Sequence, residues 1–397
     1  MGNADATTRA GRTGDLQRTA GRTRQSGTAQ DAATGTAEAI EPDRQRIFPA
    51  AHVHLSANPQ PRRSIDMKAN SSTLALALLA GFAHTAAAGE AISETREVRP
   101  DAVISIELLN GEISISGHDE NLFSIEGELN DAAEGFTLTN SNGNIHFEEE
   151  IERKNRWFWG DGWNSRDGHA GATLEIRVPR NSVLRFDGVN TNLDLIGLTG
   201  NTDVEVVNGM IVASDLSGVV RLQSVNGAID TRALSGRISL ETVNGSIDDR
   251  GSSGPRASFS AVNRSIRSDS LSPQVSASNV NGRIELDLNR IDELDVSMVG
   301  GNLDIFAFMN DLAHIEISSV GGSIDLNLPL TTSASFHVST AVGGRIRNEL
   351  SDDEPEQKRR YVNSRQLDFT LNGGSGDVNI STVSGNITVH ASTADDC

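Results

Sequence analysis

The sequence feature that most restricts the fold is a glycine that recurs every nine residues through the middle of the chain. The unbroken series comprises Gly200, Gly209, Gly218, Gly227, Gly236, Gly245 and Gly254. The glycines alternate between two contexts, Val-Asn-Gly-x-Ile and Leu-Ser-Gly, so the full repeat is 18 residues long and has two halves. Short tandem repeats of this kind predict stacked units, each of which buries its apolar face only against its neighbours.

The repeat continues beyond residue 254 with longer spacings. Val262-Asn263-Arg264 lacks the glycine, and Val280-Asn281-Gly282 restores it. Later copies read Val-Gly-Gly, or Val-Ser-Gly in the last one at Val383-Ser384-Gly385. The intervals grow to 19, 21 and 22 residues and then to 41, which we interpret as two turns with a loop between them.

Apolar residues in each half-repeat fall two before, two after and often four after the glycine, as in Leu234, Ile238 and Leu240. A period of two is typical of a strand with one buried face, and Asn-Gly or Ser-Gly supplies the positive φ of a tight turn. The chain is therefore predicted to be all-β. We expect a single-domain β-solenoid (β-helix) of about 18–22 residues per coil, with a right-handed coil favoured.

Stacking at this period would align the asparagines of the Val-Asn-Gly corners in one column. The expected column comprises Asn208, Asn226, Asn244, Asn263 and Asn281. Stacked amides hydrogen-bond to one another, so we interpret the column as reinforcement of the stack in preference to a polar binding ridge. A solvated acidic row that discourages sheet aggregation is also expected, at Asp230, Asp248, Asp304 and Asp325.

The first 88 residues differ from the repeats. Residues 1–66 lack hydrophobic periodicity and are expected to be disordered, or to be an extension that precedes the natural start at Met67. Met67-Lys68, the apolar run Thr73–Ala83 and the small residues before Gly89 predict a signal peptide at 67–88. Because that run is too short to cross a membrane, we expect an exported protein, periplasmic or at the cell surface, with no transmembrane segment in the mature chain.

The expected mature chain is strongly acidic. From Gly89 on it carries 24 basic and 47 acidic residues, a net charge of −23, whereas residues 1–88 carry ten and seven. Such a surface repels phosphate backbones, which argues against nucleic acid as a partner. Cys397 is the only cysteine, so no disulfide framework can form within the chain. We expect a monomer or a weak oligomer.

No residue pattern in the repeats predicts a catalytic, cofactor-binding or metal site. The mature chain has two lysines, Lys154 and Lys358, and its histidines are scattered, so neither a polysaccharide-lyase cluster nor a catalytic triad emerges. Gly373–Asp377 is similar to the calcium-binding β-roll repeat only in part, because its aspartate is one place early. We therefore predict no enzymatic activity and no cofactor.

One segment departs from the chemistry of the repeats. All three tryptophans of the chain occur together with a phenylalanine, at Trp157, Phe158, Trp159 and Trp163. Clustered aromatic rings bury much area in an interface, so these four residues are the candidate contact for an envelope protein or a glycan. The alternative is a cap that covers the apolar end of the solenoid.

We divide residues 89–397 into a Trp-rich loop at 153–171, regular coils at 183–347, a charged loop at 348–366 and final coils at 367–392. Three motifs here, Leu174–Pro179, the Val-Asn-Gly-x-Ile repeats and Phe369–Val389, together resemble a bacterial β-strand-repeat family of unknown function labelled "putative adhesin". The resemblance covers about residues 95–392. It implies a signal-bearing, extracytoplasmic β-solenoid, and it implies no catalytic residues.

The sequence thus predicts a non-catalytic, exported cell-envelope β-solenoid that acts as an adhesin-like binding or scaffold module. Two alternatives stay open. One is a periplasmic protein that senses or regulates envelope stress by binding a partner through the Trp-rich loop. The other, which only the predicted architecture favours, is a carbohydrate-active enzyme built on a β-helix.

Overall fold

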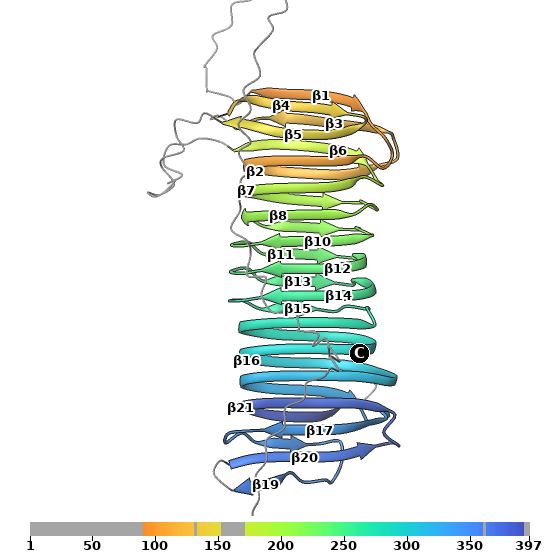
Figure 1. Ribbon diagram of the computed structural model, residues 1–397, viewed down its shortest axis with the longest axis vertical. Coiled ribbons are helices and arrows are strands. Elements are labelled where there is room, and N and C mark those ends of the chain that lie inside the picture. The colour runs from red at the N-terminus through yellow and green to blue at the C-terminus, as the bar shows by residue number, and fades with distance from the viewer. Residues whose placement is uncertain (1–89, 131–132, 152–170, 360–362, 393–397) are drawn as a thin grey trace, which may run out of the picture. The chain divides into compact units, whose positions relative to one another are not determined.

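The computed structural model describes residues 90–130, 133–151, 171–359 and 363–392, all within one unit, Gly81–Cys397. In these ranges the chain forms strands and no helix, so the fold is all-β as predicted (Figure 1). The segments 1–66 and 67–88 lie outside the described residues, and the expectations for them stay predictions.

The strands fall into three groups along the chain. The first group is β1 (Ala91–Glu97), β2 (Val103–His118), β3 (Leu122–Glu128), β4 (Ala133–Ser141), β5 (Asn144–Ile151) and β6 (Ala172–Pro179). The second is β7 (Val183–Ile196), β8 (Thr202–Asn208), β9 (Ile211–Ser214), β10 (Val219–Ser224), β11 (Ile229–Arg232), β12 (Ser235–Thr242), β13 (Ile247–Arg250), β14 (Ser253–Ala261), β15 (Ile266–Ser268) and β16 (Gln274–Pro329). The third is β17 (Ala334–Thr340), β18 (Ile346–Asn348), β19 (Glu356–Arg359), β20 (Asn363–Leu371) and β21 (Gly376–Ser392).

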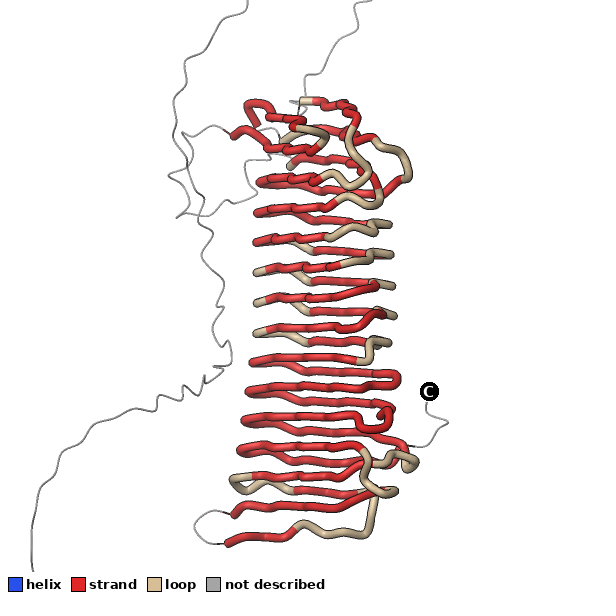
Figure 2. The backbone as a smooth tube through the Cα atoms, turned by 45° about the vertical axis from the view of Figure 1, so that its right-hand side comes forward, coloured by secondary structure: helices blue, strands red, loops and turns tan. Residues whose placement is uncertain are grey.

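In the middle group, a strand pairs in parallel with the strand one 18-residue repeat further on. Leu222 of β10 faces Leu240 of β12, and Ile229 of β11 faces Ile247 of β13. Strands β8, β10, β12 and β14 form what we call the first ladder, and β9, β11, β13 and β15 form the second. One passage through both ladders is a coil, and Figure 2 shows these coils stacked on one another.

The alternation of side chains along each strand sends every second residue into the space between the ladders. Ile229, Ile247, Ile266 and Ile284 stack there in successive coils and are at most 1% exposed. Complete burial of one such side chain stabilises the fold by about 1.5–3 kcal/mol. The apolar interior is therefore a property of the stack, since a single coil would leave both of its faces in water.

The apolar residue two places before the glycine lies differently at the two corners of a coil. At one corner it is buried as predicted, and at the other it is not. Leu216 and Leu234, two residues before the glycine of Leu-Ser-Gly, are buried as expected. The valines at the same place in Val-Asn-Gly point outward instead: Val207 is 40% and Val280 38% exposed, and Val225 and Val243 are half-buried. Strand β12 shows the reason: its last residue, Thr242, is buried, so alternation turns the next residue, a valine, outward.

Glycine is required at the corners for two different reasons. Gly218 and Gly236 have the expected positive φ, at 91° and 98°. Gly227 and Gly245 do not have a positive φ, so that prediction is wrong for these two Asn-Gly corners. Here the coils approach so closely that a Cβ on Gly227 would lie 1.6 Å from the carbonyl oxygen of Gly209. The distance between coils is the constraint at these positions.

The coils at the two ends do not stack in the order of the sequence. β2 pairs on one side with β7 and on the other with β5 and β6. β21 pairs on one side with β16 and on the other with β17 and β18, so that Ile380 faces both Ile317 and Val338. At each end, a strand from nearer to that terminus is thus interposed between the regular coils and the strands that finish the stack.

Antiparallel strands complete both ends. β3 pairs with β6 and β1, and β4 pairs with β5, while β20 pairs with β17 and β19 at the other end. The segment at 348–366, predicted as a charged loop, contains β19, and the segment at 367–392 contains β21 and the second half of β20. Reversing the strand direction ends the parallel ladders, whose open edges would otherwise be free to pair with another chain.

One carboxylate lies inside the stack. Asp249 is fully buried and accepts hydrogen bonds from Thr231 Oγ1 at 2.7 Å, from Ser268 Oγ at 2.8 Å and from Ser252 Oγ. Burial raises the pKa of Asp249, and the three hydroxyl groups oppose that shift only in part. The folded state therefore holds this proton to a higher pH than the unfolded state, so folding loses stability as the pH rises through the raised pKa.

The close approach of the coils predicts that Gly227→Ala lowers the free energy of unfolding by about 1–3 kcal/mol, because the new Cβ overlaps a backbone carbonyl. Gly300→Ala is the matched control, since the nearest heavy atom to its Cβ is 3.8 Å away and its φ is not positive. Denaturant unfolding of both variants measures the difference. Equal stabilities would contradict the distance between coils as the cause.

Asp249→Asn should flatten the dependence of stability on pH. The amide oxygen can still accept from Thr231 and Ser252, and the amide nitrogen can donate to Ser268. As the pH rises from the ordinary pKa of 3.8 to neutrality, the wild type should lose stability relative to the variant. Thermal unfolding across this range is the measurement, and parallel curves for the two proteins would show that Asp249 has an ordinary pKa.

Candidate binding surface

The residues that the sequence singles out for binding are Trp157, Phe158, Trp159 and Trp163. They lie between residues 152 and 170, outside the described ranges, so their role stays a prediction. The surfaces that the structure does describe belong to the coils and to the strands that finish the stack.

A continuous ladder of asparagine side chains runs along the Val-Asn-Gly corner. Each Nδ2 donates to the Oδ1 of the asparagine in the preceding coil, and the first four bonds are 2.6–2.7 Å long. The members are Asn190, Asn208, Asn226, Asn244, Asn263 and Asn281. The predicted column is confirmed, and because most amides bond to a neighbour on each side, it reinforces the stack by about 1 kcal/mol per bond.

Asn190 belongs to the ladder, although the Val-Asn-Gly motif does not predict it. The glycine that marks most of the other corners is absent here, because Thr191 follows Asn190. The signal that could have found it is the distance of 18 residues to Asn208 together with the preceding Val189. Register relative to the next coil identifies a member of the ladder more securely than the local Asn-Gly motif.

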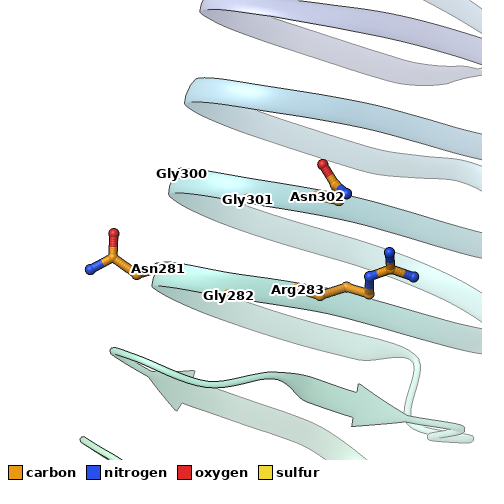
Figure 3. A pocket seen from close by; sticks show the side chains of 6 residues that line it. All are labelled: Asn281, Gly282, Arg283, Gly300, Gly301 and Asn302. Atoms are coloured by element: carbon orange, nitrogen blue, oxygen red, sulfur yellow. The ribbon is translucent and has the colours of Figure 1, made fainter.

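The ladder ends at Asn281, and the surface is hollowed there (Figure 3). The last bond, from Asn281 Nδ2 to Asn263 Oδ1, lengthens to 3.4 Å, and the next coil has Gly300 in place of an asparagine. The hollow has a volume of about 540 Å³ and is lined by Asn281, Gly282, Arg283, Gly300, Gly301 and Asn302.

The polar side chains of this hollow are largely committed to other partners. Arg283 Nη1 donates to Glu285 at 3.0 Å, and Asn302 Oδ1 accepts from Ser323 Oγ at 3.0 Å. Figure 3 shows Asn281 and Arg283 pointing away from each other. The hollow therefore offers bare glycine backbone for van der Waals contact, but few converging groups to orient a polar ligand.

The outward valines form an apolar column beside the asparagines. Past the end of the ladder the valines are 46–50% exposed, at Val299, Val320, Val342 and Val383. Successive coils stay in hydrogen-bonded register here, with Val342 N donating to Val383 O at 2.7 Å. The corner thus presents one β-branched side chain per coil to solvent, a narrow apolar line that repeats at the coil spacing.

The predicted acidic row is in part a column of ion pairs. Asp248 contacts Arg250 at 2.9 Å, and in the next coil Arg267 takes the place of the aspartate and donates through Nε to Glu285 at 2.8 Å. Burial, and then the neighbouring Asp248, raise the pKa of Asp230. Along the second ladder the column therefore reads Asp230, Asp248, Arg267 and Glu285, so the expectation of a solvated acidic row is wrong where Arg267 interrupts it.

A row made up entirely of carboxylates lies on the strands around β2. Glu148, Glu107, Asp187 and Glu205 face one another in turn across β5, β2, β7 and β8. Burial raises the pKa of Glu107, Asp187 and Glu205, and repulsion from neighbouring carboxylates raises it further. This column repels anions. In the ranges that the structure covers, no three His, Cys, Asp or Glu side chains are placed to hold a metal ion.

Two parallel ladders in an 18-residue register, closed around an apolar interior, define a class of all-β, solenoid-like repeat proteins. The family model of Toastrack DUF4097 matches residues 101–390, and the chain belongs to this family. The match supports membership of a repeat family of unknown function. It does not extend to the adhesin label, which concerns what the protein binds.

Among solved structures, the chain is similar to a "putative cell adhesion protein" from Clostridium sporogenes, with 10% sequence identity. The similarity covers 76% of this chain and 100% of that chain with a TM-score of 0.18, so it adds nothing to the argument about function. No match was found among curated proteins. The described part of the chain contains no helix long and apolar enough to span a membrane.

The asparagine ladder predicts that Asn244→Ala lowers the free energy of unfolding by about 1–2 kcal/mol, because it removes the bonds to both Asn226 and Asn263. Asn281→Ala is the comparison, since it removes only the 3.4 Å bond at the end of the ladder and should cost less than half as much. Urea unfolding of the two variants tests this. An equal or larger effect of Asn281→Ala would contradict the ladder as the source of stability.

Proposed function

We propose that the chain is a non-catalytic, exported cell-envelope module with an adhesin-like binding or scaffold role. The observation that carries the proposal is the repetition of one outer surface from coil to coil, with a column of outward valines beside a column of bonded asparagines. A surface that repeats at about 4.8 Å can offer the same weak contact many times. We also propose that the coils form a right-handed β-solenoid of 18–22 residues per coil.

The two ends of the stack support the scaffold role. Because β2 and β21 each pair on both sides, neither end strand of the regular coils is left as an open parallel edge. Because the ends finish in the antiparallel strands β1, β4 and β19, a further chain cannot simply continue the parallel ladders, which suits a monomer or a weak oligomer.

Export is the second part of the proposal. It rests on the signal-peptide pattern at 67–88, and on the acidic composition of the chain that follows, which suits a protein that does not adhere to anionic lipid. The proposed location is the periplasm or the cell surface, and the proposed partner is an envelope protein or a glycan.

The proposed contact is the aromatic cluster Trp157, Phe158, Trp159 and Trp163. Aromatic side chains contribute large contact areas at interfaces with proteins and sugars alike. The same cluster supports the second candidate function, a periplasmic protein that takes part in envelope-stress sensing by binding one partner.

Export predicts that the protein purified from fractionated native cells begins near Gly89 and comes from the periplasmic or extracellular fraction. Intact-mass and N-terminal analysis measure both properties. A cytoplasmic chain that begins at Met1 would contradict export and, with it, the envelope role.

The binding role is tested with the same purified protein by co-sedimentation with isolated envelope fragments. We expect retention, weakened about tenfold when Trp157, Trp159 and Trp163 are all replaced by alanine, with an unchanged melting temperature. Leu312→Ala is the matched control, since this residue is apolar and 79% exposed but lies on the body of coils. Absence of retention by the wild type would contradict the binding role.

A further inference from the structure

A second hollow lies at the end of the stack where β21 is interposed between β16 and β17. Its volume is about 400 Å³, and its polar lining comprises Glu316, His337, Ser339, Gln366, Asp368, Asn379 and Ser381. The lining comes from four strands, β16, β21, β17 and β20, that are separate along the chain. The site exists only because of the order in which these strands stack.

Strand register places the lining residues on a defined grid. Glu316 faces Asn379, Asn379 faces His337, and His337 faces Asp368, which makes one row across all four strands. Ser381 and Ser339 face each other two residues further along. At about 4.8 Å between strands and about 7 Å between alternate residues, the grid measures roughly 14 by 7 Å. That area accommodates a small ligand lying flat.

Internal bonds fix the orientation of two carboxylates. Asp368 Oδ1 lies 2.8 Å from His337 Nδ1, and Asp368 Oδ2 accepts from Gln366 at 2.7 Å. Asp377, at the rim, accepts from Asn379 Nδ2 at 2.7 Å and lies 3.2 Å from His314. Both carboxylates therefore have partners within the protein. Asp368 orients His337, and Asp377 orients Asn379.

The groups that remain available are of a different kind. In the part of the chain that the structure describes, Glu316, Ser339 and Ser381 form no hydrogen bond or ion pair through their side chains. His337 keeps its Nε2, and Asn379 keeps its Oδ1. The hollow thus combines one carboxylate acceptor, one amide acceptor, two hydroxyls that both donate and accept, and one imidazole nitrogen.

We propose that this hollow binds a neutral saccharide, a proposal that rests on the binding role proposed above and names its ligand class. The hydroxyl groups of a sugar donate and accept at short intervals, which matches a flat grid of mixed donors and acceptors. The carboxylates of Glu316, Asp368 and Asp377 disfavour an anionic ligand in the same place.

Other ligand classes match these groups less well. A metal ion needs several free ligands, and here Glu316 is the only carboxylate without an internal partner. A protein partner needs apolar contact area, which lies instead along the valine corner. In the regular coils, Ser278 of the first ladder bonds to Ser260 at 3.1 Å, so this pair of outward serines leaves less for a ligand.

The test is isothermal titration and saturation-transfer NMR of the purified protein with maltose, cellobiose and N,N′-diacetylchitobiose. Digalacturonate and trilysine serve as the anionic and cationic comparisons. We expect at least one of the neutral disaccharides to bind, with an affinity that salt does not change. Ser381→Tyr should fill the hollow and weaken binding at least tenfold, whereas Ser276→Tyr, the same change at an outward position of the regular coils, should leave it unchanged.

Glu316→Gln and Glu316→Ala separate hydrogen bonding from charge. For a neutral sugar, the glutamine variant should stay within a few-fold of the wild type, because its amide oxygen still accepts, and the alanine variant should lose about tenfold. Preferential binding of trilysine that salt and Glu316→Gln both abolish would overturn the saccharide in favour of a cationic partner.

The failure of this inference is distinguishable from failure of the binding role. If the protein sediments with envelope fragments but binds none of the three disaccharides, or binds one equally well with Ser381→Tyr, the saccharide site is wrong and the binding role stands. If the protein binds a disaccharide in this hollow but does not sediment with envelope fragments, the saccharide site stands and the proposed envelope-binding role is wrong. Circular dichroism of each variant shows that the strands are intact.

Discussion

The close stacking of backbone on backbone is the constraint on which the rest of this structure depends. A Cβ at Gly227 would overlap the carbonyl oxygen of Gly209 in the preceding coil, and a Cβ at Gly245 would lie 1.7 Å from the carbonyl oxygen of Gly227. That spacing is what brings side chains of equal register within hydrogen-bonding distance, so the asparagine ladder and the isoleucine columns are both its consequences. Backbone geometry therefore determines which columns can form, and side-chain chemistry then decides what each column does.

The ends of the stack are the second constraint, because a parallel ladder has no natural termination. The chain meets it by interposing β2 and β21, so that each end is finished by strands that reverse direction. The final strands β17 and β20 pack Phe336 against Phe369, stacked at 4.4 Å between ring centroids, in the interior of that end. Closing the stack thus adds an aromatic contact as well as backbone hydrogen bonds.

The sequence predicts what the repeat determines and misses what depends on neighbours outside it. Periodicity was sufficient for the all-β fold, the buried Leu234 and the asparagine column, because each follows from a fixed distance along the chain. It was not sufficient for the outward valines, since the direction of a side chain depends on where the strand ends. The 19-residue step to Asn263 is a bulge, in which Ser235 pairs with Ser253 but Arg237 pairs with Arg256. Non-sequential pairing of β2 and β21 has no signature in spacing at all.

The same reasoning explains why the two hollows differ. The hollow at Asn281 arises where a repeated side chain is missing, so it exposes backbone and offers little new chemistry. The hollow at β21 arises where strands that are distant in sequence become neighbours, so residues with no common repeat position, such as Glu316 and Asp368, lie in one row. A surface that repeats from coil to coil offers the same kind of contact at every coil. Contacts of different kinds that converge on one ligand require a break in the repeat, and in this chain that break is also what closes the stack.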